Sequence, residues 1–244
     1  MNLSEITEKS PMRVLEKSIN MGMGPGSLGV IMARAGVGKT ACLVHIAIDR
    51  ILLGKQVAHV SIDESSDRVR AWYQETARNL ANYYGVSESQ GGQEGPGIAG
   101  TLKSLVKSNI EGNSVILNYT KSTFSIERLK QSLKTLEEQL NFKPSMLVID
   151  DVDFETVDRS FFEEAKQLAE DASLEIWFSA RCFHEPKRMN KRGIPYPCDK
   201  IDDLFDVIVM LKPNPPIITL QVLKGNGHSE GGIHLDPKTM LLKK

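Results

Sequence analysis

Residues 27–43 read SLGVIMARAGVGKTACL, a short apolar run followed by a glycine-containing loop and a second apolar run. This pattern predicts a buried strand at 28–32, a turn, and a helix that starts at Thr40. A loop of this kind directs successive backbone N–H groups and a helix N-terminus toward one point, which suits a polyphosphate. The stretch therefore predicts a strand–loop–helix unit that binds a nucleoside triphosphate.

The loop follows the phosphate-binding pattern G-x-x-x-x-G-K-[ST] at all but its first position, where Ala33 replaces glycine. That position ends the strand, where the backbone can keep a negative φ, so alanine is compatible with the turn. Lys39 adds a positive charge for the β- and γ-phosphates, and Thr40 adds a hydroxyl for Mg²⁺. The residues predicted to hold the nucleotide are Ala35, Gly36, Val37, Gly38, Lys39, Thr40 and Ala41.

Composition narrows the class of protein. A length of 244 residues fits one large α/β domain or two small ones. The 30 basic and 31 acidic side chains nearly cancel, so any contact with nucleic acid requires a local patch. The apolar runs fall well short of the roughly 20 residues that span a bilayer, and the polar start MNLSEITEKS does not resemble a signal peptide. With only 3 cysteines and no disulfide framework, a cytoplasmic protein without a membrane partner is expected.

Apolar segments alternate with amphipathic ones, which predicts an α/β fold with a mostly parallel central sheet flanked by helices. The predicted strands are continuous apolar stretches, as expected for strands buried on both faces, at 28–32, 57–62, 115–118, 146–149 and 175–179. Helices are predicted at 40–53, 66–84, 126–140 and 160–172, with caps at Ser66 and Ser125 and a capping box at Ser160 and Glu163.

The two ends of the chain differ from this core. The β-rich runs 206–211 and 217–223 are joined by the proline-rich segment 212–216, which predicts a hairpin, and a short strand is predicted at 232–235. Residues 87–100 are predicted to form a loop. Residues 1–25 are interpreted as an N-terminal arm or short helix, and residues 26–244 as a single domain.

Carboxylates follow two of the predicted strands. Asp150 comes directly after the strand at 146–149, where a side chain can reach Mg²⁺, so Asp150 is predicted to share the metal site with Thr40. Asp151 either supports this site or begins an exposed acidic loop.

Asp63 and Glu64 follow the strand at 57–62. Hydrolysis requires a group that orients or deprotonates the attacking water, and we favour Glu64 for this role. Because successive strand residues point to opposite sides, only one of the two carboxylates is expected to face the γ-phosphate. The alternative is that both begin the next helix, where they interact favourably with its dipole.

The segments ARAGVGKTA, VSIDES, LVIDD, WFSAR and LQVLKGNG, in this order, resemble the RecA-type P-loop ATPase core. The closest resemblance is to the motor domains of DnaB-type hexameric helicases and to KaiC-like ATPases, over about residues 25–240. The resemblance implies ATP and Mg²⁺ as ligands and a ring or filament, such as a hexamer, with ATP between subunits. It also implies that Glu64 or Asp63 activates water and that Asp150 serves the metal.

The same resemblance gives Lys224 a meaning, because in this family a basic residue on a late β-segment reaches the γ-phosphate of the adjacent subunit. A second basic residue is expected two positions later, where this chain has Asn226. A polar residue is also expected at the end of the strand at 175–179, and both Ser179 and Arg181 are available. The alternative for Lys224 is a solvated turn residue.

A basic segment follows that strand and contains Lys187, Arg188, Lys191 and Arg192. The resemblance places it near a DNA-contacting loop, where several copies would line a positive channel for single-stranded DNA. An ordinary solvated basic loop is the alternative. Three functions remain open: an ATPase acting on single-stranded DNA, a KaiC-like ATP-driven switch acting on a protein partner, and a nucleotide-binding structural subunit without turnover.

Overall fold

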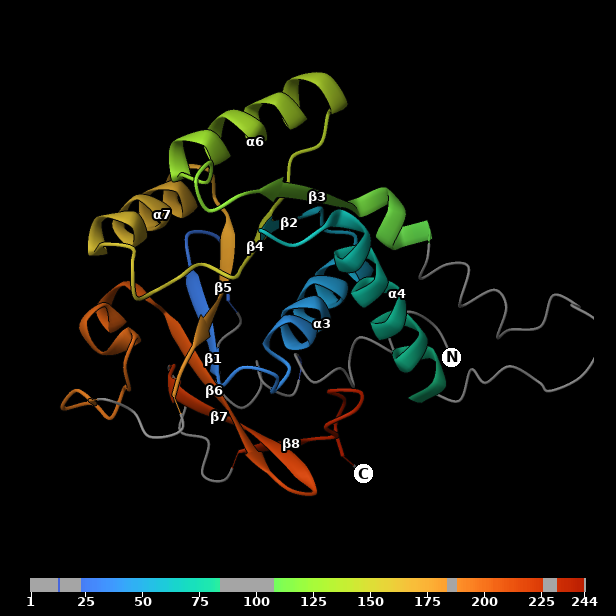
Figure 1. The fold of residues 1–244 in the computed structure, drawn as a ribbon. Coiled ribbons are helices and arrows are strands. Elements are labelled where there is room, and N and C mark those ends of the chain that lie inside the picture. Colours follow the sequence, from blue (N-terminus) through green and yellow to red (C-terminus); the bar gives the residue numbers. More distant parts are fainter. Residues whose placement is uncertain (1–12, 14–22, 84–107, 184–187, 226–231, 244) are drawn as a thin grey trace, which may run out of the picture.

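The structure is a computed structural model that describes residues 13, 23–83, 108–183, 188–225 and 232–243 (Figure 1). Its strands are β1 (Leu28–Ala33), β2 (Val57–Ile62), β3 (Ser114–Tyr119), β4 (Met146–Asp150), β5 (Glu175–Arg181), β6 (Val207–Asn214), β7 (Ile217–Lys224) and β8 (Ile233–Leu235). Its α-helices include α3 (Lys39–Leu52), α4 (Ser66–Tyr83), α6 (Ile126–Leu140) and α7 (Arg159–Asp171), and two 3₁₀-helices are η1 (Cys198–Lys200) and η2 (Asp202–Leu204).

The described strands form one eight-stranded sheet in the order β3-β2-β4-β5-β1-β6-β7-β8. All pairs from β3 to β6 are parallel, and β7 and β8 extend the sheet with antiparallel pairs. The predicted α/β fold with a mostly parallel sheet and a hairpin-rich end is therefore confirmed.

The loop predicted at 212–216 is largely wrong. Lys212, Pro213 and Asn214 belong to β6 and pair with β7, so only Pro215 and Pro216 remain for the turn. Proline has no N–H to donate, but this stretch projects beyond the parallel part of the sheet, where β6 pairs with β7 alone. Pro213 therefore interrupts no ladder on its other side.

Helices cover both faces of the sheet. One apolar core contains the inward side chains of α3 and α4, and the other contains those of α6 and α7 (Figure 1). Along β2, Val57 faces the first core and Ala58 the second. This alternation explains why the strands read as continuous apolar stretches, since both sides of each strand are buried.

Helix α3 is deeply buried, as its apolar composition predicts, and every residue from Cys42 to Ile51 is buried. Its last turn carries a charge into this interior. The Arg50 guanidinium donates from Nε to Glu175 Oε2 at 2.9 Å, and Trp177 Nε1 donates to Glu175 Oε1 at 2.8 Å. The pairing compensates the burial of both charges and fixes the end of α3 against β5.

The predicted helix caps have mixed outcomes. Ser125 caps α6 as predicted, because its side chain accepts a hydrogen bond from Arg128 N. For α4 the prediction is wrong by one residue: Ser65, and not Ser66, accepts from Arg68 N at 3.3 Å. Ser66 instead donates its hydroxyl to a β3 side chain, so it ties the helix start to the sheet.

The capping box predicted at Ser160 and Glu163 is also wrong. Helix α7 begins at Arg159, with Asp158 at the N-cap position and no side-chain cap bond. The Glu163 carboxylate accepts a hydrogen bond from Arg159 Nε at 2.7 Å, so it is not directed back to a capping serine. An i,i+4 ion pair thus replaces the reciprocal cap.

Most of the predicted arm at 1–25 and the whole predicted loop at 87–100 lie outside the described residues, and the division into an arm and one domain stays a prediction. Within the described ranges, no helix combines the length and apolar character needed to cross a bilayer.

Candidate nucleotide-binding site

The predicted site residues lie at one edge of the sheet. The P-loop follows β1, Asp63 and Glu64 follow β2, and Asp150 ends β4. Because β1, β2, β4 and β5 are parallel members of one sheet, their carboxyl ends meet at the same edge. Ligand sites in such sheets lie in the crevice outside the carboxyl ends of the strands.

The backbone of the P-loop depends on its glycines. Gly36 has φ 76° and Gly38, at the N-cap position of α3, has φ 105°, both in the left-handed region that favours glycine. Ala33, the departure from the glycine pattern, ends β1 fully buried and is not among the non-glycine residues with positive φ. The substitution is therefore compatible with the loop, as predicted.

A turn near the C-terminus packs against this loop and was not predicted from the sequence. A Cβ atom at Gly38 would lie 2.9 Å from Met240 Sδ, so the methionine side chain occupies the space beside the glycine. Met240 is buried and has φ 56°, a left-handed conformation that is uncommon for a residue with a side chain. His45 on α3 holds the turn, since its Nε2 lies 2.8 Å from Thr239 O. The separation of about 200 residues along the chain leaves no local signal for this contact.

Thr40 and Asp150, the predicted metal-site pair, meet in the structure. Thr40 Oγ1 donates to Asp150 Oδ2 at 2.6 Å. Both groups offer hard oxygen atoms, the ligands that Mg²⁺ prefers, and together they fit a metal at the β- and γ-phosphates. The second oxygen of Asp150 accepts hydrogen bonds from Ser179 Oγ and, at 3.1 Å, from Asp151 N.

A pocket of about 520 Å³ opens beside this pair. Its polar lining residues are Lys39, Asp63, Glu64, Lys121, Asp151, Asp153, Glu155, Ser179 and Arg181. The pocket thus joins the P-loop lysine to both candidate water-activating carboxylates. Of the two polar residues considered at the end of β5, Ser179 contacts Asp150 and Arg181 lies exposed at the pocket.

The expectation that only one of Asp63 and Glu64 faces this region is wrong, because both line the pocket. Strand β2 ends at Ile62 and Asp63 turns with φ 62°, so the alternation of a strand no longer applies. The two carboxylates nevertheless have different surroundings. Asp63 Oδ1 accepts from Lys121 N at 3.1 Å, and its Oδ2 lies 3.6 Å from Lys121 Nζ.

Glu64 has a more exchangeable partner. Its Oε2 lies 3.2 Å from Arg68 NH1, and this arginine side chain is 64% exposed. Exposed ion pairs contribute little and rearrange readily, whereas Asp63 is fixed by a backbone N–H as well as an ammonium group. Asp63 therefore organises the turn after β3, and Glu64 is better placed to respond to a ligand.

Asp151 contributes a further negative charge at the wall of the pocket. Partial desolvation raises the pKa of its carboxyl group, and Asp150 raises it further. Lys39 acts in the opposite direction, while Glu64 adds to the increase. These mutual effects show that the carboxylates and the P-loop lysine share one electrostatic environment.

The predicted nucleic-acid residues are in part already paired. Arg188 forms an ion pair with the buried Asp199, and Arg192 Nε lies 2.8 Å from Oδ2 of the buried Asp202. These contacts fasten the basic segment to η1 and η2. Lys191 is exposed, and Lys187 lies outside the described residues.

The basic segment also contains an aromatic contact that its sequence did not indicate. The Arg188 guanidinium lies 4.6 Å from the ring centre of Tyr196, and this ring stacks on Phe183 with centroids 6.2 Å apart. The three side chains come from both ends of the segment, so the stack is visible only in three dimensions.

Lys224 lies at the end of β7 and does not line the pocket beside the P-loop. Its Nζ donates to Asp202 O at 2.7 Å. Partial burial lowers the pKa of Lys224, and the neighbouring Asp202 and Asp206 partly offset this effect. Within one chain the lysine is thus a fixed, half-buried cation away from the nucleotide pocket.

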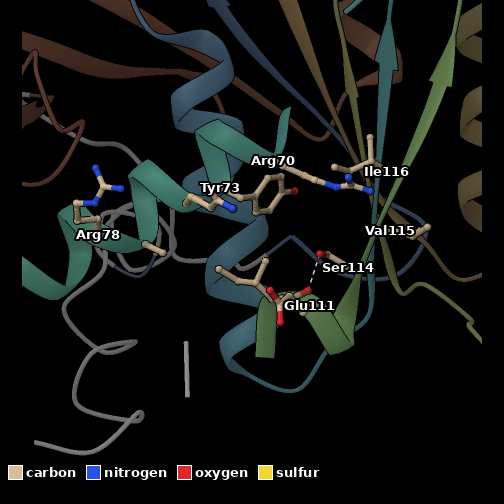
Figure 2. A pocket seen from close by; sticks show the side chains of 10 residues that line it. Arg70, Tyr73, Arg78, Glu111, Ser114, Val115 and Ile116 are labelled. Carbon is tan, nitrogen blue, oxygen red and sulfur yellow. Dashed lines mark hydrogen bonds between the residues drawn. The ribbon is translucent and has the colours of Figure 1, made fainter. Parts of the chain in front are cut away.

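A larger pocket of about 800 Å³ lies elsewhere, between α4 and β3. Figure 2 shows Arg70 and Tyr73 of α4 on one side of it and Ser114 and Ile116 of β3 on the other. Its strand residues come from the beginning of β3, whereas the P-loop lies at the carboxyl edge of the sheet. Size alone therefore does not identify the nucleotide site.

Comparison with known proteins supports the fold. No protein-family model and no curated protein sequence matches the chain. Among solved structures, the chain is similar to an ATPase domain, with a TM-score of 0.66 and 14% identity over 96% of this chain and 90% of that one. At this identity the likeness concerns the fold, which is that of a RecA-like ATPase domain.

Proposed function

We propose that the chain is a Mg²⁺-dependent P-loop ATPase of the RecA/DnaB-like class that binds and hydrolyses ATP. The observation that carries this proposal is the 2.6 Å hydrogen bond between Thr40 and Asp150, two residues 110 positions apart. It unites the start of the P-loop helix with the end of β4, beside a pocket that contains Lys39 and Glu64. The solved ATPase domain with the same fold adds support.

Each residue has a defined role in this proposal. The backbone N–H groups of 35–41 and the Lys39 ammonium group bind the phosphates. Thr40 and Asp150 hold Mg²⁺, which when bound neutralises charge on the β- and γ-phosphates. Glu64 orients the attacking water and accepts its proton.

Self-association into a ring or filament, such as a hexamer, belongs to the same proposal. Lys224 supports it, because this cation lies away from the pocket of its own chain and is positioned by Asp202. Its proposed role is to reach the γ-phosphate bound by a neighbouring copy.

Action on single-stranded DNA is proposed for the basic segment. Lys191 is exposed and forms no ion pair within the described ranges, and the Arg188–Tyr196 stack lies nearby. The paired state of Arg188 and Arg192 favours the second candidate, a KaiC-like switch acting on a protein partner, because it removes charge from the surface.

Steady-state ATPase assays with and without single-stranded DNA test the choice. We expect stimulation by the DNA, and expect the Lys187→Ala/Lys191→Ala variant to reduce the slope of log affinity against log salt by about 1.4, the value for two phosphate contacts on a single strand. The lysines are chosen because removing Arg188 or Arg192 would leave a buried carboxylate unpaired and destabilise the fold.

An unchanged rate, together with no retention of DNA at low salt, contradicts the DNA role. Nucleotide-dependent oligomerisation without DNA stimulation then supports the switch. ATP binding without any phosphate release supports the third candidate, a structural subunit.

A further inference from the structure

The Asp150 carboxylate lies between two buried serines on neighbouring strands. Ser61 of β2 is the register partner of Asp150, and Ser179 of β5 follows directly after the paired residues Ile149 and Phe178. Both serines are 2% exposed and Asp150 is 3% exposed. Their hydroxyl groups, however, make different contacts.

Ser179 forms two hydrogen bonds at this point of the sheet. Its Oγ donates to Asp150 Oδ1 and accepts from Asp151 N at 3.1 Å. The Ser61 hydroxyl instead donates to Glu64 O at 3.4 Å. Ser179 is therefore the serine that holds the carboxylate.

We propose that Ser179 is a positioning residue for the Mg²⁺ site, which fixes the Asp150 carboxylate so that its Oδ2 faces Thr40. This inference rests on the proposed nucleotide site. Each carboxylate oxygen then has its own hydroxyl partner, Ser179 for Oδ1 and Thr40 for Oδ2. With both oxygens held, rotation of the carboxylate group is restricted before a metal arrives.

Ser179 also stabilises the backbone that follows. Asp151 has φ 64°, a left-handed conformation that costs about 1–2 kcal/mol for a residue with a Cβ atom. Its N–H reaches both Ser179 Oγ and Asp150 Oδ1. One hydroxyl group thus joins the end of β4, the turn after it and β5.

Hydrogen-bond partners of a metal ligand orient that ligand, and their loss typically lowers metal affinity roughly 10- to 100-fold. Without the Ser179 hydroxyl, Oδ1 keeps only the Asp151 N–H as a partner among these contacts. The carboxylate then gains rotational freedom, and part of the binding free energy of the metal is spent on ordering it.

The test uses the full chain with ADP and Mn²⁺ as the probe for the metal site, and electron paramagnetic resonance to measure free Mn²⁺. Ser179→Ala is expected to lower Mn²⁺ affinity roughly 10- to 100-fold, while ADP binding in EDTA is unchanged. Ser61→Ala, the matched control at the other neighbouring strand, is expected to keep wild-type Mn²⁺ affinity. Ser179→Cys keeps the volume and weakens both hydrogen bonds, so it is expected to lose affinity in the same direction if the alanine variant does not fold.

Wild-type Mn²⁺ affinity in the Ser179 variants overturns the inference, as does an equal loss in Ser61→Ala. A parallel loss of ADP binding in EDTA also overturns it, because that result indicates a general structural role. The proposed function fails separately, if the wild-type chain itself binds no Mn²⁺ with nucleotide.

Discussion

Glu64→Gln is expected to lower kcat for ATP hydrolysis by roughly 100- to 10,000-fold, the usual contribution of a general base. The amide preserves the size of the side chain but cannot accept the proton of the attacking water. ATP affinity should be unchanged, since Lys39 and the loop backbone bind the phosphates. Phosphate release and fluorescent-ATP binding, measured on the same preparation, separate the two effects.

Asp63→Asn is the matched control for this experiment. Its carboxylate is held by the backbone and the side chain of Lys121, so its loss is expected to loosen the turn after β3 with a much smaller effect on kcat. If Asp63→Asn stops turnover while Glu64→Gln hydrolyses ATP normally, the two roles are reversed.

Acid is expected to destabilise the fold strongly between about pH 6.5 and about pH 4. Burial lowers the pKa of His45 from 6.5 to about 4, and burial likewise lowers the pKa of His59 to about 4. The unfolded chain takes up protons near pH 6.5 and the folded chain does not, so the free energy of unfolding falls as the pH drops through this window. At about pH 5 the loss amounts to about 2 kcal/mol for each histidine.

Urea unfolding at a series of pH values measures this dependence. His59 contacts Tyr73 OH at 3.2 Å and its Nε2 has no hydrogen-bond partner within the described part of the chain, so His59→Leu removes one titrating group from the core. The variant should show about half the acid-dependent loss, whatever its stability at neutral pH. An equally steep loss in wild type and variant argues against a buried neutral His59.

The fold was predictable because its signals are local. The apolar run at 28–32, the glycines of the P-loop and the carboxylates after two strands each act over a few residues. Parallel pairing then brings Asp150 to the same edge as Thr40 without further information. Helix ends were less predictable, because Ser65 and Ser66 are equally suitable caps in sequence and the contact with β3 decides between them.

The unpredicted parts of the site depend on contacts between distant segments. Met240 reaches Gly38 only because β8 returns the chain to α3. The pairing of Arg188 and Arg192 with buried carboxylates depends on how η1 and η2 pack, so a basic run in the sequence overstated the exposed charge. Ser179 had been considered for its position, but its bond to Asp150 requires the register between β4 and β5.

The most direct test of the account is a titration of fluorescent ATP with and without Mg²⁺, using wild type, Lys39→Ala and the control Lys121→Ala, which alters a lysine of the same pocket. Wild type should bind with Mg²⁺, Lys39→Ala should bind roughly 10- to 100-fold more weakly through loss of a charge-assisted hydrogen bond, and Lys121→Ala should remain close to wild type. Wild-type protein that binds no ATP, or Lys39→Ala that binds it as tightly as wild type, would contradict the account.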